Sequence, residues 1–306
     1  MRPITVVFFL TIGFLSGCHS VNGNNRMDFR DTSPSHIEVI DRNGEKVFQI
    51  EGRIKDIVDT IQWNSGAGYV AVMDIPSHFF MNPGRILICN LGSGSIARNY
   101  VREGWTIHVA EPDSALISTV KKNFPTGIID SAFSCDDGRN YLTSHPAEFD
   151  IILIDGIAPA QLPTALLTKE FFMLTSGHIS HDGMVGIAVE SVGWNDAVVQ
   201  SLCATLKAVY KNVFVLPIAE PPDQFGSIVI LATNSDKNIV RDPSRNTSLD
   251  PDWRYSSEYQ KTHAWDNHFT PNTGNGTILT DGFNRYDTMF TKLIDSARAH
   301  GNDYTP

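Results

Sequence analysis

Cysteine is scarce in this chain of 306 residues, which contains four of them. Cys18 belongs to a separate N-terminal motif, and the remaining three form an odd number. Two of these three lie in or beside apolar runs, which favours buried free thiols over a disulfide framework. We therefore expect unpaired thiols at Cys89, Cys135 and Cys203.

Positive charge is also in deficit, because 24 Lys and Arg residues face 34 Asp and Glu residues and the formal net charge is -10. This balance argues against a general nucleic-acid-binding protein, which needs a basic face, so no nucleic-acid partner is expected. Basic substrates such as polyamines would be attracted to an acidic protein, but acidity alone does not identify them. The ten histidines are interpreted as showing no metal-ligand pairing with cysteine or carboxylate at helical spacing, so we expect no metal.

The N-terminal apolar stretch, Ile4 to Phe14, is too short to span a bilayer. It follows a basic residue and ends in Leu15-Ser16-Gly17-Cys18, which resembles a bacterial lipobox with Cys18 as the lipidated first residue of the mature protein. Residues 19–35 are rich in Asn, Ser and Gly and fit a flexible tether. We predict a lipoprotein-type signal peptide over residues 1–18 and a membrane-anchored lipoprotein on the periplasmic side of a bacterium. The alternative is a cytoplasmic protein whose translation starts at Met27.

Residues 36–80 are predicted to form a small N-terminal β cap. Asn43-Gly44 lies between two alternating apolar runs, which is a strong hairpin signal. The next run, Ile54 to Ile61, either pairs with this hairpin or begins a helix.

Residues 81–235 alternate between strand-like and helix-like segments, which predicts a doubly wound, mostly parallel sheet. The expected strands are residues 85–90, 105–110, 129–134, 150–155, 184–190, 212–217 and 227–232, and the expected helices are 96–103, 113–123, 138–144, 164–180 and 195–210. Seven strands with the last reversed favour an α/β fold of the Rossmann-like, S-adenosylmethionine-dependent methyltransferase type over the dehydrogenase type. Residues 236–306 read as an irregular C-terminal extension that ends in a helix near Tyr286 to His300 and is held by Trp253 and Trp265.

The segment Arg85–Asp113 has the order strand, glycine loop, helix, strand, acid, which is typical of a nucleotide site. The loop Gly92-Ser93-Gly94-Ser95 lets the backbone approach a ligand closely, and Glu111 at the end of the second strand can accept two ribose hydroxyls. A third glycine of the dinucleotide fingerprint is absent, so a nucleoside such as S-adenosylmethionine is favoured over NAD. The alternative is a tight strand–helix turn without a ligand.

Three acids, Glu111, Asp137 and Asp155, each follow or end a predicted strand. Open parallel sheets bind their ligands at the carboxyl ends of the strands. An acid after the third strand can accept the adenine amino hydrogen, and one after the fourth can steer or deprotonate an amine. Each acid could instead serve as a helix N-cap.

Several motifs together resemble those of the spermidine synthase (polyamine aminopropyltransferase) family over roughly residues 37–295. Besides the glycine loop, they are Glu111-Pro112-Asp113 for the family's E-I-D, Asp137–Leu142 for its D-G-R/A-x-F-L, Phe149–Asp155 for its Y-D-V-I-I-x-D, Leu167–Phe172 for its L-x-x-x-E-F-F, and Leu279-Thr280-Asp281 for the L-T-D of its diverged members. The resemblance implies decarboxylated S-adenosylmethionine or S-adenosylmethionine as donor and a small-molecule amine as acceptor. Members of this family commonly form homodimers.

The departures from the family fall mainly on the acceptor side. Ser95 stands where the family's G-G-G-D-G has its acid, and Asp155-Gly156-Ile157-Ala158-Pro159 keeps only the first acid of D-S-S-D-P. Tyr69-Val70-Ala71 resembles the family's Y-x-E without the acid, whereas Glu190 resembles the acid of its E-S-x-W. Each lost carboxylate would have met a cationic amine, so the diamine pocket is predicted to be dismantled.

We hypothesise a polyamine-biosynthesis-like transferase that moves an aminopropyl or methyl group by in-line displacement at a sulfonium carbon. Asp155 is the expected catalytic residue, and Tyr69 and Glu190 are expected on the acceptor side. The donor site is expected to comprise Gly92, Gly94, Ser95, Glu111 for the ribose and Asp137 for the adenine. Two alternatives remain, a methyltransferase and a non-catalytic membrane-anchored lipoprotein that retains the fold.

Overall fold

The computed structural model describes residues 36–157, 163–194, 196–218, 225–236 and 257–299, which belong to one compact unit running from Thr32 to Pro306. The predicted signal peptide and tether, with Cys18, lie outside the described residues. Within the described ranges, no helix combines the length and the apolar character needed to cross a bilayer.

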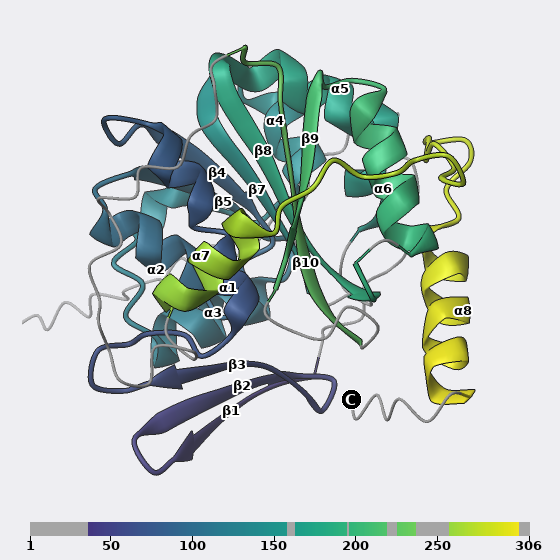
Figure 1. Ribbon diagram of the computed structural model, residues 1–306. Helices are drawn as coiled ribbons and strands as arrows, with labels where there is room; N and C mark the ends of the chain where they lie inside the picture. The colour runs from purple at the N-terminus through teal and green to yellow at the C-terminus, as the bar shows by residue number, and fades with distance from the viewer. Residues whose placement is uncertain (1–35, 158–162, 195, 219–224, 237–256, 300–306) are drawn as a thin grey trace, which may run out of the picture. The chain divides into compact units, whose positions relative to one another are not determined.

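A seven-stranded sheet lies at the centre of this unit (Figure 1). In spatial order its strands are β6 (Phe133–Ser134), β5 (Thr106–Ala110), β4 (Arg85–Cys89), β7 (Phe149–Gly156), β8 (Ile179–Val192), β10 (Phe225–Thr233) and β9 (Asn212–Pro217). The first five are parallel, and β10 runs antiparallel to both of its neighbours. The predicted α/β fold of methyltransferase type, with its last strand reversed, is thereby confirmed.

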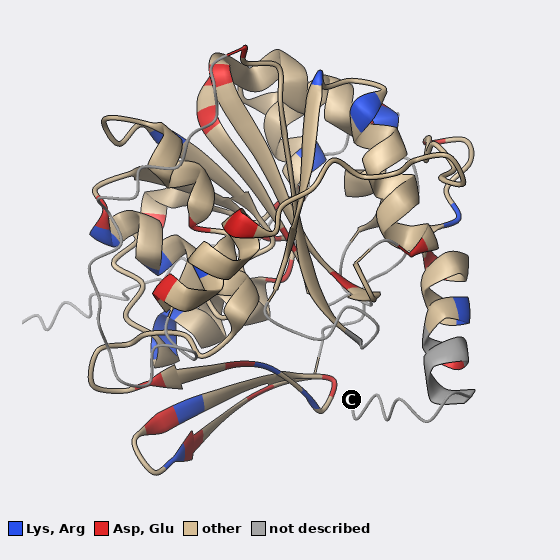
Figure 2. Ribbon diagram, in the orientation of Figure 1, with Lys and Arg blue, Asp and Glu red and all other residues tan. Residues whose placement is uncertain are grey.

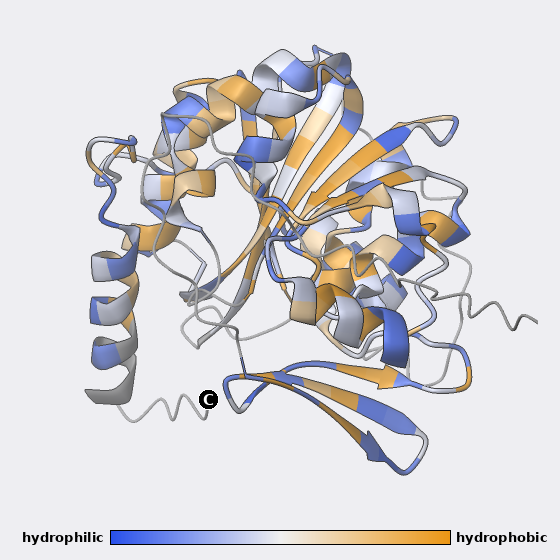
Figure 3. Ribbon diagram, turned by 180° about the vertical axis from the view of Figure 1, so that it is seen from behind, coloured by the Kyte–Doolittle hydropathy of each residue, from blue (hydrophilic) through white to orange (hydrophobic). Residues whose placement is uncertain are grey.

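Alternate residues of the central strands enter two separate cores. In β4, Ile86 and Ile88 face the first core and Leu87 and Cys89 the second. The first core is covered by α1 (Gly68–Val72), α2 (Ser95–Arg102), α3 (Ser114–Asn123) and α7 (Ser257–Asp266), and the second by α4 (Gly138–Ser144), α5 (Lys169–His178), α6 (Ala197–Lys207) and α8 (Tyr286–Ala299). Because both faces are buried, the central strands are apolar along most of their length, as Figure 3 shows.

A second, three-stranded antiparallel sheet is formed by β1 (Ile37–Arg42), β2 (Glu45–Ile50) and β3 (Arg53–Asp59). Asn43 and Gly44 both have positive φ, 46° and 87°, as the predicted hairpin turn requires. The run from Ile54, for which the sequence allows a strand or a helix, pairs with β2 as part of β3. Charged residues are frequent on β1 and β2 (Figure 2), whereas Phe48 and Val58 are fully buried in the first core.

Four local expectations differ from the structure. The expected strand 129–134 consists of a turn, η2 (Asp130–Ala132), followed by the two-residue β6. The expected helix 164–180 is divided into η3 (Thr164–Leu167) and α5, because Thr168 is extended and caps the second part. Within the stretch expected to be irregular, residues 257–266 form α7, and its Trp265 packs on Phe79 of the short helix η1 (Ile75–Phe79). Cys89 and Cys203 are buried free thiols as predicted, but Cys135 is disulfide-bonded, so the expectation is wrong there.

Candidate functional site

The loop between β4 and α2 turns sharply at the carboxyl edge of the sheet. Asn90, Gly92 and Gly94 have φ values of 67°, 54° and 78°, a region that side chains with a Cβ rarely adopt. A Cβ added to Gly92 would lie 2.5 Å from Oδ2 of Asp155, and Nδ2 of Asn90 donates to the Asp155 carbonyl at 3.1 Å. The absence of a side chain at Gly92 therefore makes room for Asp155.

Gly94 serves the packing of the protein itself. A Cβ at this position would lie 2.8 Å from Cγ2 of Thr126 and 2.9 Å from Cγ1 of Val120, a residue of α3. The loop must therefore pass close to α3 whether or not a ligand is bound.

Ser95, at the place of the family's loop acid, is bonded to a carboxylate from another part of the chain. Its Oγ donates to Oδ2 of Asp56 at 2.6 Å, and Oγ of Ser93 donates to the same oxygen at 2.5 Å. Oγ of Ser65 donates to the other oxygen, Oδ1, at 2.5 Å. Asp56 comes from β3 and is only 2% exposed. An acid is thus present beside the loop, delivered by the N-terminal sheet.

Arg98 of α2 is also hydrogen-bonded to this cluster. Its Nη2 donates to Oγ of Ser95 at 2.7 Å, and the residue is 2% exposed. Burial lowers the pKa of Arg98 to about 10, and the carboxylate of Asp56 opposes that shift. Asp56 and Arg98 are therefore buried opposite charges connected through the Ser95 hydroxyl, which accepts from Arg98 and donates to Asp56.

Glu111 directly follows β5 and is 4% exposed. Its Oε2 accepts from the backbone N–H of Leu91 at 2.9 Å, and its Oε1 accepts from that of Asp113 at 2.8 Å. Burial raises the pKa of Glu111 to about 7, although both hydrogen bonds oppose the shift. The predicted ribose acid is therefore fixed against the glycine loop, and each of its oxygens keeps a lone pair that can accept a further hydroxyl.

Asp137 is half-buried and caps helix α4. Its Oδ1 accepts from the backbone N–H groups of Arg139 and Asn140 at 2.8 and 2.9 Å, and its Oδ2 accepts from Nδ2 of Asn140 at 2.9 Å. The alternative hypothesis, that this acid is a helix N-cap, is therefore confirmed. Its predicted role toward adenine stays a prediction.

Asp155 is the second-to-last residue of β7, at the carboxyl end of the strand, and it is 8% exposed. Oδ2 accepts from the Tyr69 hydroxyl and Oδ1 from the backbone N–H of Ile157, both at 3.3 Å. Burial raises the pKa of Asp155 to about 6, and that of Tyr69 rises well above its usual range for the same reason. The structure therefore brings together Asp155, the predicted catalytic residue, and Tyr69, which was predicted on the acceptor side.

Glu190 of β8 is paired with a cation of the chain itself. Nζ of Lys55 lies 2.8 Å from its Oε1 and also donates to the Ile157 carbonyl at 2.7 Å, while Nη1 of Arg53 lies 3.9 Å from its Oε2. The side chains of Lys55 and Glu190 are only 8% and 9% exposed. Burial raises the pKa of Glu190, and the Lys55 ammonium opposes that shift.

Three further motifs of the sequence meet in one hydrogen-bonded cluster. Arg139 forms a bidentate ion pair with Asp281, with N–O distances of 2.7 and 2.9 Å. The Thr168 hydroxyl donates to Oδ1 of Asp281 at 2.7 Å, and Glu170 accepts from the Asp281 N–H at 2.9 Å. The D-G-R, E-F-F and L-T-D motifs are therefore joined to one another by hydrogen bonds and an ion pair, which stabilise the fold.

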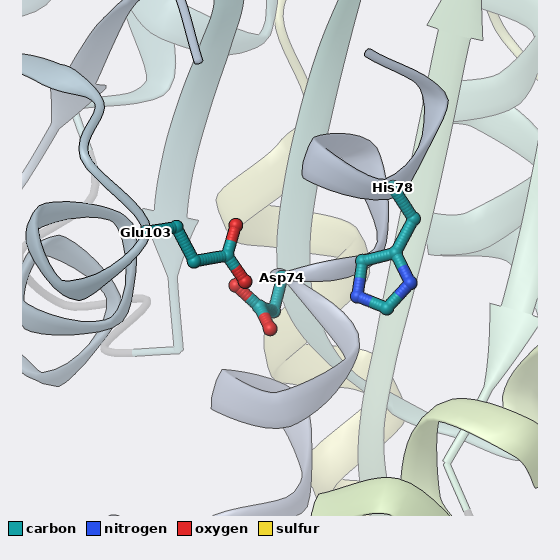
Figure 4. A group of neighbouring side chains, drawn as sticks. All are labelled: Asp74, His78 and Glu103. Atoms are coloured by element: carbon teal, nitrogen blue, oxygen red, sulfur yellow. The ribbon is translucent and has the colours of Figure 1, made fainter. Parts of the chain in front are cut away.

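Among the described residues, Asp74, His78 and Glu103 form one group that could hold a metal ion, with donor atoms within 4.8 Å of one another (Figure 4). Lys261 of α7 already forms an ion pair with Asp74, so a cation of the chain balances this carboxylate. A pocket of about 340 Å³ shares Glu103 and is further lined by Ser77, Phe80, Pro83 and Trp105. Since Pro83 and Trp105 precede β4 and β5, these features lie at the amino edge of the sheet, away from Asp155.

Lys55 and Asp56 were not predicted as site residues. A signal was present, because Asp56 stands in β3 in register with the buried Val58, where an apolar residue is expected. Sequence alone does not show which part of the sheet such a charge would meet.

The strand order and the carboxyl-edge loop define the class of this protein as Rossmann-like α/β proteins of the methyltransferase type. The model of the spermine/spermidine synthase domain matches residues 69–242, more than half of the chain, and the chain belongs to this family.

Curated relatives agree with this assignment, and solved structures share the fold. The chain is 24% identical over 216 residues to a polyamine aminopropyltransferase of Thermoanaerobacter sp. (strain X514), covering 67% of this chain and 76% of that protein. It is 26% identical over 182 residues to polyamine aminopropyltransferase 1 of Aquifex aeolicus, covering 57% and 65%. A probable spermidine synthase from Corynebacterium glutamicum superposes with a TM-score of 0.58 at 20% identity, over 72% of this chain and 82% of that one. The spermidine synthase of Thermotoga maritima superposes with a TM-score of 0.52 at 16% identity, over 74% of this chain and 83% of that one. Both solved structures therefore have the same fold as this chain.

Proposed function

We propose that this protein binds decarboxylated S-adenosylmethionine or S-adenosylmethionine and transfers its aminopropyl or methyl group to an amine. The observation that carries the proposal is the convergence of two acids on one loop. Glu111 accepts from the N–H of Leu91 at 2.9 Å, and Asp155 lies against Gly92, the next residue. A nucleoside held by Glu111 would therefore present its sulfonium group close to Asp155.

The chemistry of transfer fits the state of Asp155. The amine nitrogen attacks the carbon bound to the sulfonium, the carbon–sulfur bond breaks with its electron pair going to sulfur, and the amine proton must leave. A carboxylate whose pKa is raised by burial to about 6 is ionised near neutral pH and is a stronger base than an ordinary aspartate. Asp155 can thus orient the amine and take its proton, with Tyr69 holding the carboxylate in position.

The donor assignment is supported by Glu111, Gly92 and the chain's membership of the family. One solved spermidine synthase, similar to this chain at 15% identity and a TM-score of 0.51, is a complex with a transition-state analogue, AdoDATO. Whether the group transferred is aminopropyl or methyl depends on which donor binds and on which sulfonium-bound carbon the amine attacks.

Calorimetric titration of the full chain with S-adenosylmethionine, decarboxylated S-adenosylmethionine and methylthioadenosine tests the proposal. We expect binding of at least one donor and of methylthioadenosine, and a loss of about ten-fold or more in Glu111→Ala, which removes two hydroxyl-accepting oxygens. Asp41→Ala, an exposed acid on β1, serves as the control and should bind like the parent. If none of the three nucleosides binds, the proposal that this protein is a transferase is overturned.

A second function, a non-catalytic membrane-anchored protein that retains the fold, is favoured by the pairing of Glu190 with Lys55. We propose, as its location, the periplasmic side of a bacterial membrane through lipidated Cys18, with a cytoplasmic product from Met27 as the alternative. Fractionation of cells that express the tagged chain and its Cys18→Ser variant separates the two. Membrane recovery that depends on Cys18 supports the anchor, and a soluble product of unchanged location in both supports the cytoplasmic alternative.

A further inference from the structure

The ammonium of Lys55 lies at the carboxyl edge of the sheet, where the proposed acceptor would sit. It donates to the carbonyl of Ile157, two residues after Asp155, and to the carboxylate of Glu190 on the neighbouring strand β8. Lys55 itself comes from β3 of the N-terminal sheet. A cation of the chain is therefore held between the ends of the two strands that carry the proposed acceptor-side residues.

The electrostatic reach of Lys55 extends to Asp155. Its charge lowers the pKa of Asp155, against the larger effect of burial, while Asp56 raises it. No described lysine, arginine or histidine forms an ion pair with Asp155 itself. Of the described carboxylates at this edge, Glu190 is paired with Lys55 and Asp56 accepts three serine hydroxyls. Glu111 is assigned to the ribose of the donor, and Asp137 caps helix α4. Asp155 is therefore the carboxylate left to receive an ammonium from outside.

We propose that Lys55 permanently fills the position of a second ammonium in the acceptor site, so that the acceptor is a monoamine. This inference rests on the proposed function and specifies its substrate class. One amino group of the acceptor meets Asp155. A second ammonium placed near Glu190 would lie beside the ammonium of Lys55, and the carboxylate of Glu190 is already paired with Lys55. The second ammonium would therefore be buried without an anion of its own, and a buried unpaired charge costs several kcal/mol.

The same geometry predicts what removal of Lys55 does. Lys55→Ala leaves Glu190 buried without its closest cation and opens the space that the butylammonium side chain occupied. An amine from solution can then take over the contacts to Glu190 and the Ile157 carbonyl. The variant is expected to be less stable than the parent and to be restabilised by amines.

Two probes, 1-aminobutane and 1,4-diaminobutane, distinguish one ammonium from two. They are titrated into the methylthioadenosine-saturated protein by calorimetry, and thermal unfolding is followed with each. We expect the parent chain to bind 1-aminobutane at least as tightly as the diamine. Lys55→Ala should reverse this order, with diamine affinity rising about ten-fold or more, and each amine should raise its unfolding temperature.

Two controls isolate the position. Lys46→Ala removes a lysine of the same sheet that pairs with the exposed Asp41. This variant should leave the order of the two amine affinities unchanged. Lys55→Ala combined with Glu190→Gln should lose the gain in diamine affinity. If Lys55→Ala does not fold, Lys55→Met, which keeps the alkyl stem, is expected to show the same reversal.

The outcomes separate this inference from the function on which it rests. Methylthioadenosine binding together with an unchanged amine order in both Lys55 variants, or a parent chain that prefers the diamine, overturns the monoamine assignment alone. Failure of methylthioadenosine to bind the parent overturns the proposed function.

Discussion

Oδ2 of Asp56 lies 2.6 Å from Oγ of Ser95, although the two residues are 39 positions apart in the sequence. Asp56 belongs to the N-terminal sheet and Ser95 begins the helix after the glycine loop. The carboxylate that the loop motif lacks is therefore supplied by a different part of the chain. It accepts hydrogen bonds from serine hydroxyls and interacts electrostatically with the opposite charge of Arg98.

Restoring an acid in the loop should conflict with Asp56. In Ser95→Asp two buried carboxylates would lie side by side, and we expect the free energy of unfolding to fall by about 2–4 kcal/mol. Asp56→Ser alone should cost about 3 kcal/mol, because Arg98 loses its opposing charge. The double variant should recover much of the loss, and urea unfolding of all four proteins measures the coupling. Strictly additive changes in the free energy of unfolding would show that the carboxylates at positions 56 and 95 do not interact.

Gly92 and Gly44 offer a matched pair for separating backbone strain from steric conflict. Both have positive φ, 54° and 87°, but a Cβ at Gly44 meets nothing within 4 Å, whereas one at Gly92 meets Asp155. Gly44→Ala should cost about 1–2 kcal/mol from strain, and Gly92→Ala about 1–3 kcal/mol more from the clash. In an Asp155→Ala background the excess at Gly92 should disappear. An excess that persists there contradicts the assigned contact.

Asp155 should make the protein less stable as the pH rises from about 4 to 6. Its pKa is raised by burial to about 6 from 3.8, so the native state holds more protons than the unfolded state in this window. The loss amounts to at most about 3 kcal/mol, at about 1.4 kcal/mol for each pKa unit. Asp155→Asn should flatten this part of the stability profile, which chemical unfolding at a series of pH values reveals. A profile parallel to that of the parent chain would count against the burial effect.

If the proposed transfer occurs, the ionised form of Asp155 takes the proton, so single-turnover rates should rise with pH through about 6. Asp155→Asn should lose at least about 100-fold in rate while retaining methylthioadenosine binding within about three-fold, because the carboxylate acts on the acceptor. Rapid-quench assays and calorimetry give the two quantities. Loss of nucleoside binding to the same extent as rate would assign Asp155 to the donor instead.

The Arg139–Asp281 pair should show the opposite pH dependence. Burial raises the pKa of Asp281, but the hydrogen bonds and charge of Arg139 and the Thr168 hydroxyl outweigh this and lower it. A depressed pKa contributes stability above the unfolded value of 3.8, and this contribution is lost as the pH falls through the lower native value. Asp281→Asn should therefore cost about 1–3 kcal/mol at pH 7 and progressively less toward pH 3. A cost that is independent of pH would contradict the ionic origin.

Much of the framework was accessible from sequence because its signals are local. The Asn43-Gly44 turn, the apolar runs of β4 and β7 and the positive-φ glycines each depend on a few neighbouring residues. The α7 helix escaped prediction because its buried residues are Lys261 and Ala264, which do not form an apolar face. Thr168 likewise interrupts the expected helix through its extended backbone rather than through any apolar break.

The doubly wound sheet, the glycine loop and the acids at the strand ends follow from local sequence patterns, because periodicity and turn chemistry act over short distances. The sequence also showed which acids are missing from the acceptor side. The charges found near the site depend on contacts between distant segments, since Asp56 contacts Ser95 across 39 positions of chain and Lys55 contacts Glu190 across 135. Whether a buried charge is balanced depends on its neighbours in space, and those neighbours are set by the packing of the N-terminal sheet against the site.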